Sequence, residues 1–508
     1  ILNLLTFKKK IAHQKFKQTG NLYDYDYFSS LRAQCKELSS KLDPYIRKIN
    51  TNICNNPKFV WKFIKDRKRC NDIPTEMFLN HKVAKDGHDI AKLFAEYFSS
   101  VYSHDNLSDY DCSSFISNSI NDPGLHVSIT DVFDSILNLK VSCNPGPDGI
   151  PSLFIKKCIF TLSPPICNLF KLSLIDLKFP DAWKISYIVP IYKAGQRNQV
   201  DSYRGVCNQM ILPKIFDLIV SKQLSWMSSS ILTEKQHGFR PKRSTLTNLI
   251  EYYSYLNESF GNRCQVDAIY TDFSKAFDKV NQRILLLKLS HLGFRRETII
   301  WLRSFLCDRW QQVRLGNFLS EPFQVTSGVP QGSHCGPLLF LLFINDLSQV
   351  FHHCNFLFFA DDLKLFSCIR SIQDTFLVQS DLDAFCSWCT RNELHLNTTK
   401  CHSISFCNKK TIIHFDYVLD KTVIDHVNEV KDLGVLFDSS LSFKNHYLTV
   451  ITKAFKLWGF LWRNCKDLSP AVLKILYCSL VRPHLEYASS VWYPIYDVDA
   501  AALEKVQK

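Results

Sequence analysis

The stretch Phe356-Leu357-Phe358-Phe359-Ala360-Asp361-Asp362-Leu363-Lys364-Leu365-Phe366 places two adjacent aspartates between two apolar runs. Short apolar runs on either side of a tight polar centre predict a β-hairpin. Asp361 and Asp362 would then lie at the hairpin tip, while the Phe and Leu side chains hold the strands in a core. Two neighbouring carboxylates at a buried edge repel each other, and a divalent cation relieves that repulsion. Oxygen ligands without clustered His or thiolate favour magnesium over zinc.

An isolated Asp-Asp pair is more often a solvated turn than a metal site. A second acidic strand end upstream favours the metal site here. Ala268-Ile269-Tyr270-Thr271-Asp272 is a short apolar run that ends in an aspartate. It is followed by Phe273-Ser274-Lys275-Ala276-Phe277-Asp278 and then by a helix-like segment. A strand-end carboxylate beside a hairpin-tip carboxylate is what two-metal phosphoryl or nucleotidyl transfer needs.

The composition predicts a folded chain with a polyanionic substrate. The chain has 508 residues, enough for several domains, and 46% are apolar, which excludes global disorder. Its formal net charge is +13. A basic chain with an acidic centre suggests basic surfaces that hold a polyanion around a metal, although a merely basic soluble protein would have the same charge.

The nineteen cysteines show no framework spacing, and no secretory signal peptide opens the chain, which indicates reduced intracellular thiols. Cys386 and Cys389 form a Cys-x-x-Cys in a predicted helix without a second clean pair, so buried thiols are favoured over a zinc site. The apolar run 338–344 is too short to cross a bilayer, and no membrane contact is expected. Because the chain starts with Ile, we expect a fragment of a longer reading frame.

Several basic segments precede the acidic centre. Residues 59–64 mix aromatics with lysines that could stack on RNA, or form an amphipathic helix with a solvated basic face. The segment 186–193 predicts a strand that ends in Lys193, and Arg204 follows on a facing strand. These two cations could clamp a triphosphate, or be surface charge on a hairpin. In the basic turn 236–240, His237 is expected to be a structural hydrogen-bonding group.

The remaining motifs follow along the chain. Residues 287–310 look helical, and 312–315 look like a strand. The Gly- and Pro-rich loop 327–333 would allow close backbone approach to a ligand. Residues 430–438 predict a second tight hairpin. From residue 446 the pattern is helical, with basic residues interleaved with Trp, which would either track a duplex or form an ordinary amphipathic face.

In this order the motifs resemble the reverse transcriptases of non-LTR (LINE-like) retrotransposons, particularly the Jockey and CR1-like group. The resembling segments are Gly146-Pro147-Asp148-Gly149-Ile150, Ile188-Val189-Pro190-Ile191-Tyr192-Lys193 with Tyr203-Arg204, Gln236-His237-Gly238-Phe239-Arg240, Asp272 to Asp278, Gly328-Val329-Pro330-Gln331-Gly332-Ser333, Phe359-Ala360-Asp361-Asp362, Asn397-Thr398-Thr399-Lys400 and Leu433-Gly434-Val435. Each motif is modest alone, but the whole set in the family's order makes a chance match very improbable.

The resemblance implies an α+β right-hand polymerase fold with fingers, palm and thumb and a helical N-terminal extension. Residues 1–125 would be that basic extension, a linker to an absent endonuclease, and 126–255 the fingers. Residues 256–445 would be the palm, with the catalytic aspartates and a primer-grip hairpin, and 446–508 a truncated thumb.

The resemblance also assigns roles to single residues. Asp272 and Asp361 would bind Mg²⁺, or Mn²⁺ in its place, with Asp362 as third carboxylate, and Lys400 would protonate the departing pyrophosphate. The aromatic ring of Phe277 would exclude a 2′-hydroxyl. The predicted dNTP-binding residues are Lys193, Arg204, Phe277, Gln331 and Gly332, the primer-grip residues are Leu433 and Gly434, and the nucleic-acid contacts are Arg240, Lys453, Lys456 and Arg463.

The implied function is an RNA-directed DNA polymerase that extends a DNA primer with dNTPs on an RNA template. Template RNA, target DNA and an element-encoded RNA-binding protein would be its partners, in nuclear and cytoplasmic ribonucleoprotein. Gly205-Val206-Cys207 and Cys335 depart from the family pattern without touching a metal ligand, which puts efficiency in doubt. Two alternatives are an RNA-templated RNA polymerase, in which no aromatic gate at Phe277 is expected, and an inactive, truncated element copy that at most binds RNA.

Overall fold

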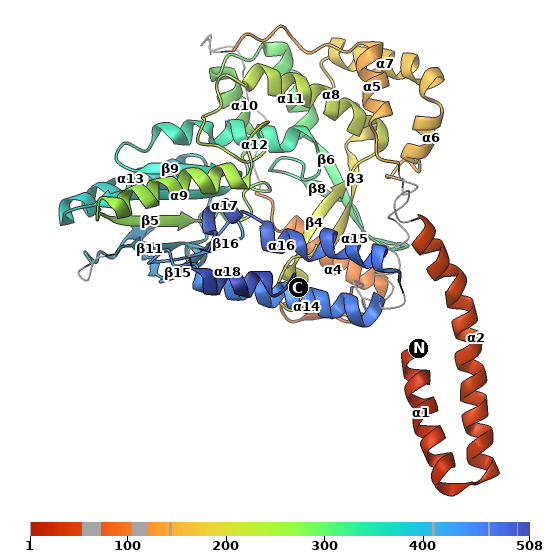
Figure 1. Ribbon diagram of the computed structural model, residues 1–508. Helices are drawn as coiled ribbons and strands as arrows, with labels where there is room; N and C mark the ends of the chain where they lie inside the picture. Colours follow the sequence, from red (N-terminus) through yellow and green to blue (C-terminus); the bar gives the residue numbers. More distant parts are fainter. Residues whose placement is uncertain are drawn as a thin grey trace. The chain divides into compact units, whose positions relative to one another are not determined.

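The computed structural model in Figure 1 describes residues 2–52, 73–103, 120–141, 145–408, 412–465, 468–494 and 496–507. The aromatic and lysine-rich segment at 59–64 lies outside these residues. The chain divides into two compact units, one of Ile73–Ser442 and one of Ile1–Asp72 with Phe443–Lys508. Helices and sheets are mixed through the larger unit, and helices open the chain, as the α+β prediction requires.

Sheet I carries the two acidic motifs in the larger unit. Its strand order is β14-β11-β5-β10-β9. The bounds are β5 (Gln265–Thr271), β9 (Asn355–Phe359), β10 (Asp362–Ile369), β11 (His402–Phe406) and β14 (Asp425–His426). Strand β10 pairs antiparallel with both β9 and β5, so the predicted hairpin is confirmed. Because Leu363 pairs with both Phe358 and Thr271, strands β9 and β5 end at the same edge of the sheet.

Sheet II has the order β4-β3-β6-β7, with β8 also on β6. Its strands are β3 (Ile185–Tyr192), β4 (Tyr203–Asn208), β6 (Arg309–Leu315), β7 (Phe318–Leu319) and β8 (Phe323–Val325). The predicted helix over 287–310 was wrong in two places, because it is interrupted between α10 (Gln282–His291) and α11 (Arg296–Leu306) and it ends early. Helix α11 stops at Leu306, Asp308 takes a positive φ of 57°, and Trp310 already pairs with Ile185 in the β3–β6 ladder.

Helices pack against both sheets of this unit, with α9 and α13 on sheet I and α4 on sheet II (Figure 1). They are α4 (Gly87–Ser99), α5 (Ile129–Leu137), α6 (Ser152–Lys157), α7 (Ile159–Ile175), α8 (Ile211–Ser228), α9 (Thr245–Gly261), α10 (Gln282–His291), α11 (Arg296–Leu306), α12 (Cys335–Ile344) and α13 (Ile372–Arg391). The most apolar, α12, is buried on nearly every side and contacts α8 and α10. A stacked pair of rings, Phe170 on Phe216 at 4.4 Å between centroids, lies in the main hydrophobic core that α7 and α8 share with α12.

The segment before the first motif is part of this unit. A short hairpin, β1 (Met77–Leu79) and β2 (Lys82–Ala84), leads into α4. Phe94 of α4 is fully buried and meets Tyr203 of β4 edge-on at 5.2 Å. Residues 77–99 therefore share a hydrophobic core with sheet II, which sequence analysis did not anticipate.

The second unit is helical in its described parts. Helices α1 (Leu2–Thr19) and α2 (Leu22–Asn52) form a helical hairpin (Figure 1) in which Lys15 and Asp24 are 2.9 Å apart. The C-terminal helices are α14 (Lys444–Cys465), α15 (Pro470–Leu480), α16 (Arg482–Glu486), α17 (Ser489–Trp492) and α18 (Asp497–Glu504). Among the described helices of both units, none combines the length and apolarity needed to cross a membrane.

Candidate active site

Asp272 and Asp361 line one cavity of about 360 Å³. Asp272 directly follows β5, and Asp361 is the second residue of the two-residue turn that joins β9 to β10. Asp362, the first residue of β10, lines a neighbouring cavity of about 580 Å³, which Asp272 also borders. The structure thus brings the three predicted carboxylates to one edge of sheet I, shared between two cavities.

Burial and neighbouring negative charge oppose the ionisation of Asp361 and Asp362. Burial raises the pKa of Asp361, and the negative charge of Asp272 adds to that rise. The pKa of Asp362 is raised to about 6, first by burial and then by the charges of Asp361 and Asp272. A bound cation would relieve this repulsion, and carboxylate oxygens suit a hard divalent ion. The donor set therefore fits the predicted metal, although the described residues hold no ready-made group of three or more His, Cys, Asp or Glu ligands.

Two cations face these carboxylates across the first cavity. Arg204 on β4 pairs with Ile191 on β3, and Lys193 follows β3, where its N–H donates to the Ser202 carbonyl at 2.9 Å. Both side chains line the cavity. The positive charges of Arg204 and Lys193 lower the pKa of Asp361 against the effect of burial, so both lie within electrostatic reach.

Two of the predicted sugar and base contacts, Phe277 and Gln331, line another wall of this cavity, and Gly332 follows Gln331 without lining it. The Phe277 ring stacks on Phe340 with 4.4 Å between centroids, which fixes its plane. The Gln331 amide donates to the Asp278 carboxylate at 2.7 Å. Gly332 has a φ of +105°, and a Cβ there would lie 2.7 Å from the Cys207 carbonyl oxygen, so only glycine lets the loop approach β4 this closely.

Lys400 lies between the two cavities and borders both. Its Nζ is 3.4 Å from Oδ2 of Asp272. The short turn η5 (Thr398–Lys400) carries Lys400, and the turn is tied to the site because the Asn397 N–H donates to the Asp272 carbonyl at 2.8 Å. The Lys400 ammonium is thereby held beside the Asp272 carboxylate.

A hairpin of β15 (Glu429–Asp432) and β16 (Val435–Asp438) borders the second cavity. Its turn residues Leu433 and Gly434 have φ of 42° and 95°, the pattern of a type I′ turn. The second predicted hairpin is therefore confirmed, and Leu433 lies on the wall that Asp362 shares.

The turn that carries Asp361 is held by Gln236, which lies 124 residues before Ala360. Ala360 has a φ of +58°, a costly conformation for a residue with a side chain. The side-chain oxygen of Gln236 accepts from the N–H of Ala360 at 2.9 Å and of Gly238 at 2.7 Å. The Gln236 amide donates back to the Ala360 carbonyl at 3.3 Å. This support could not be predicted from the sequence, because no local pattern links Gln236 to Ala360.

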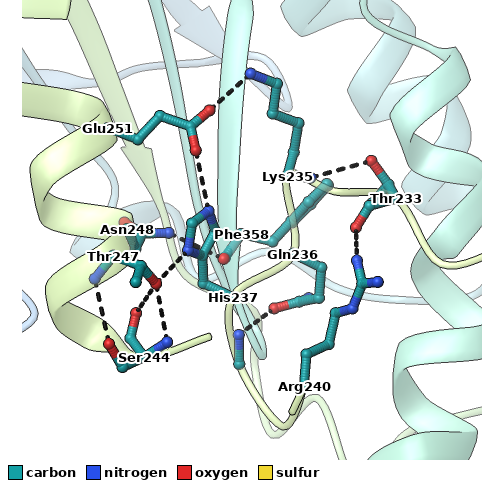
Figure 2. A network of polar contacts seen from close by, with 11 residues as sticks. Thr233, Lys235, Gln236, His237, Arg240, Ser244, Thr247, Asn248, Glu251 and Phe358 are labelled. Carbon is teal, nitrogen blue, oxygen red and sulfur yellow. Dashed lines mark hydrogen bonds and ion pairs between the residues drawn. The ribbon is translucent and has the colours of Figure 1, made fainter. Parts of the chain in front are cut away.

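The same segment is fixed by the polar network of Figure 2. His237 contacts Thr247 Oγ1 through Nδ1 at 2.8 Å, with Nε2 3.3 Å from Glu251, which is the structural role predicted for it. The Arg240 guanidinium donates to the carbonyl oxygens of Leu232 and Thr233. Arg240 therefore braces its own loop here, and its predicted contact with nucleic acid stays a prediction.

The other predicted nucleic-acid contacts belong to the second unit. Lys453, Lys456 and Arg463 are exposed on α14, where their side chains are accessible to a ligand. The Cys-x-x-Cys of Cys386 and Cys389 lies within helix α13, as predicted.

Residues 191–437 match the family model described as reverse transcriptase (RNA-dependent DNA polymerase). The chain carries a reverse transcriptase domain. Two Drosophila melanogaster relatives are the probable RNA-directed DNA polymerase from transposon BS and the RNA-directed DNA polymerase from mobile element jockey. The first is 24% identical and covers 85% of this chain and 50% of the relative; the second is 28% identical and covers 72% and 41%.

Both relatives are polymerases of mobile elements, the kind of protein that the motifs resemble, and this chain spans half or less of their length. Telomerase from Candida albicans, solved in complex with a fragment of telomeric RNA, aligns with a TM-score of 0.36 and 14% identity over 67% of each chain.

Gly238→Ala is expected to destabilise the reverse transcriptase domain by about 1–3 kcal/mol, because the added Cβ would lie 2.3 Å from the Ala360 nitrogen and must displace the turn. Gly261→Ala is the matched control, since its Cβ meets nothing within 4 Å at the end of α9. Urea unfolding measures both free energies. Equal stability of the two variants would contradict the proposed support of the turn.

Asp362→Asn is expected to stabilise the metal-free chain at pH 7 by about 1 kcal/mol. The folded pKa of Asp362, about 6, lies above its ordinary 3.8, so the folded state binds the proton more tightly. Stability from this group is therefore greatest at low pH and falls as the pH rises from about 4 to 6. Unfolding in EDTA between pH 4 and 7 measures the difference in unfolding free energy between wild type and Asp362→Asn, which should approach zero toward pH 4. A difference that does not change with pH would contradict the raised pKa of Asp362.

Proposed function

We propose that this chain is the polymerase part of a non-LTR retrotransposon protein and acts as an RNA-directed DNA polymerase, adding dNTPs to a DNA primer 3′-hydroxyl on an RNA template. The observation that carries the proposal is the first cavity, where Asp272 and Asp361 face Lys193 and Arg204. Nucleotidyl transfer from a nucleoside triphosphate requires carboxylates that bind metal ions and, opposite them, cations that bind the phosphates.

Asp272 and Asp361, with Asp362 beside them, would hold Mg²⁺, or Mn²⁺ in its place. When bound, the ions lower the pKa of the primer hydroxyl and neutralise charge on the triphosphate. Lys193 and Arg204 bind the phosphates, and the planar guanidinium of Arg204 can contact two phosphate oxygens at once. Lys400 can donate a proton to the leaving pyrophosphate, a general-acid role suited to its place beside Asp272.

The remaining wall of the first cavity selects the nucleotide. Phe277, fixed by its stacking on Phe340, would meet a 2′-hydroxyl on the incoming sugar, so dNTPs are preferred over NTPs. Gln331, tied to Asp278, and Gly332, close to β4, would hold the nascent base pair. The aromatic gate is the feature that favours DNA synthesis over the alternative RNA-templated RNA polymerase.

The second cavity receives the primer. Leu433 and Gly434 would act as a primer grip, because their turn lines the cavity that also contains Asp362 and Lys400. The exposed cations Lys453, Lys456 and Arg463 on α14 would contact the duplex backbone. We further propose that its partners are template RNA, target DNA and an element-encoded RNA-binding protein. Its location would be nuclear and cytoplasmic ribonucleoprotein.

Primer extension on an RNA template with Mg²⁺ and dNTPs tests the proposal. Wild type is expected to extend the primer, and Asp361→Asn to lose at least about 100-fold in kcat, because a charge that stabilises the transition state is removed. Asp383→Asn, an exposed carboxylate on α13, is the control and should extend normally. RNA binding without extension by wild type would support the alternative of an inactive element copy, and extension by Asp361→Asn would point to another site.

Phe277→Ala is expected to raise the kcat/KM for NTPs relative to dNTPs by about 10-fold or more, since the side chain that excludes the 2′-hydroxyl is gone. Competition between dGTP and GTP in the extension assay gives the ratio. Phe239→Ala, which removes the ring that meets Phe277 edge-on at 6.1 Å without touching the stacking on Phe340, is the control. An unchanged ratio in Phe277→Ala would exclude Phe277 as the gate.

A further inference from the structure

Lys364 and Asp432 form an ion pair that is buried from solvent. The Lys364 ammonium contacts Oδ2 of Asp432, and the two side chains are only 4% and 8% exposed. The ammonium also lies 4.3 Å from the centre of the Tyr252 ring. Desolvating two charges is costly, and apolar residues of similar volume are often as stable, so stability alone is a weak explanation for this pair.

The pair joins the two hairpins of the second cavity. Lys364 lies two residues after Asp362 on β10, and Asp432 is the last residue of β15 before the Leu433–Gly434 turn. Both residues line the cavity. The ion pair thus connects the strand that begins with a catalytic carboxylate to the tip of the facing hairpin.

The base of that hairpin is anchored differently. The Cys407 N–H donates to the Ser439 carbonyl at 3.1 Å, and the Val427 N–H donates to the Ser403 carbonyl at 2.8 Å. These backbone bonds lie at the open end, away from the turn. In the strand order of the described sheets, β15 and β16 pair only with each other, and neither strand pairs with β10.

We propose that Lys364 and Asp432 are positioning residues that set the distance between the β15–β16 turn and the catalytic carboxylates, and through it the position of the primer 3′-hydroxyl. The inference rests on the proposed polymerase function and on the primer entering the second cavity. Neither side chain would touch the primer hydroxyl or the triphosphate. Lys364 acts through Asp432, and Asp432 acts through the turn that follows it.

The test uses the full chain with Lys364→Met/Asp432→Leu, which removes both charges together and leaves no unpaired buried ion. Single-turnover extension of a preformed DNA primer on template RNA is measured over a dNTP series, beside thermal unfolding and the primer–template Kd. The expected result is a loss of about 10-fold or more in the maximal rate, because a displaced hydroxyl reacts slowly. The KM for dNTP, the primer–template Kd and Tm should change little.

Lys288→Met/Asp346→Leu is the matched control. That ion pair, with Nζ 2.7 Å from Oδ1, joins α10 to the turn η4 (Asn345–Gln349) and borders neither cavity, so the maximal rate should stay at the wild-type value. If the Lys364→Met/Asp432→Leu variant does not fold, Lys364→Arg keeps the pair while changing its length, and the same loss of rate is expected.

A wild-type maximal rate in a folded Lys364 variant would overturn the inference. So would a loss of rate that only accompanies a lower Tm and weaker primer–template binding, because that pattern indicates a structural role. These outcomes leave the proposed function intact as long as wild type extends the primer. Failure of wild type itself to extend would overturn the proposed function, and this inference with it.

Discussion

Repulsion among three carboxylates at one edge of sheet I is the constraint on which the rest of the larger unit depends. Strand pairing forces them together, because Leu363 on β10 is opposite Thr271 on β5. Burial and mutual charge raise the pKa values of Asp361 and Asp362, so the site is costly without positive charge. The chain supplies part of that charge from three separate segments, through Lys193, Arg204 and Lys400, and bound divalent ions would supply the rest.

Such a site needs rigid supports, and these come from residues far apart in the chain. The Asp361 turn is strained at Ala360 and is held by Gln236, which is itself fixed by the network around His237. Gln331 is held by Asp278, a carboxylate whose pKa burial raises to about 6. In each case a polar side chain forms hydrogen bonds with buried polar groups on a neighbouring segment. The same hydrogen bonds hold the residues of the site in place.

Local patterns were enough to predict the parts of the site that local sequence builds. The Asp361 hairpin, the strand before Asp272 and the Leu433–Gly434 turn follow from short apolar runs around turn residues. The supports could not be predicted, since Gln236 and Ala360 are separated by more than a hundred residues. The end of α11 at Leu306 was also missed, because pairing of Trp310 with β3 overrides the helical pattern there.

The packing of α4 has a consequence for where a functional unit of this protein begins. The family match starts at residue 191, yet the first cavity is also lined by Tyr97 and Tyr102, from α4 and the residues after it. The Lys275 ammonium donates to the Tyr97 hydroxyl at 2.9 Å, three residues from Asp272. The Tyr102 hydroxyl donates to Gln311 on β6 at 2.9 Å. A chain cut at the start of the family match would lose this wall and the core beneath sheet II, so the segment from Met77 onward belongs to the catalytic unit.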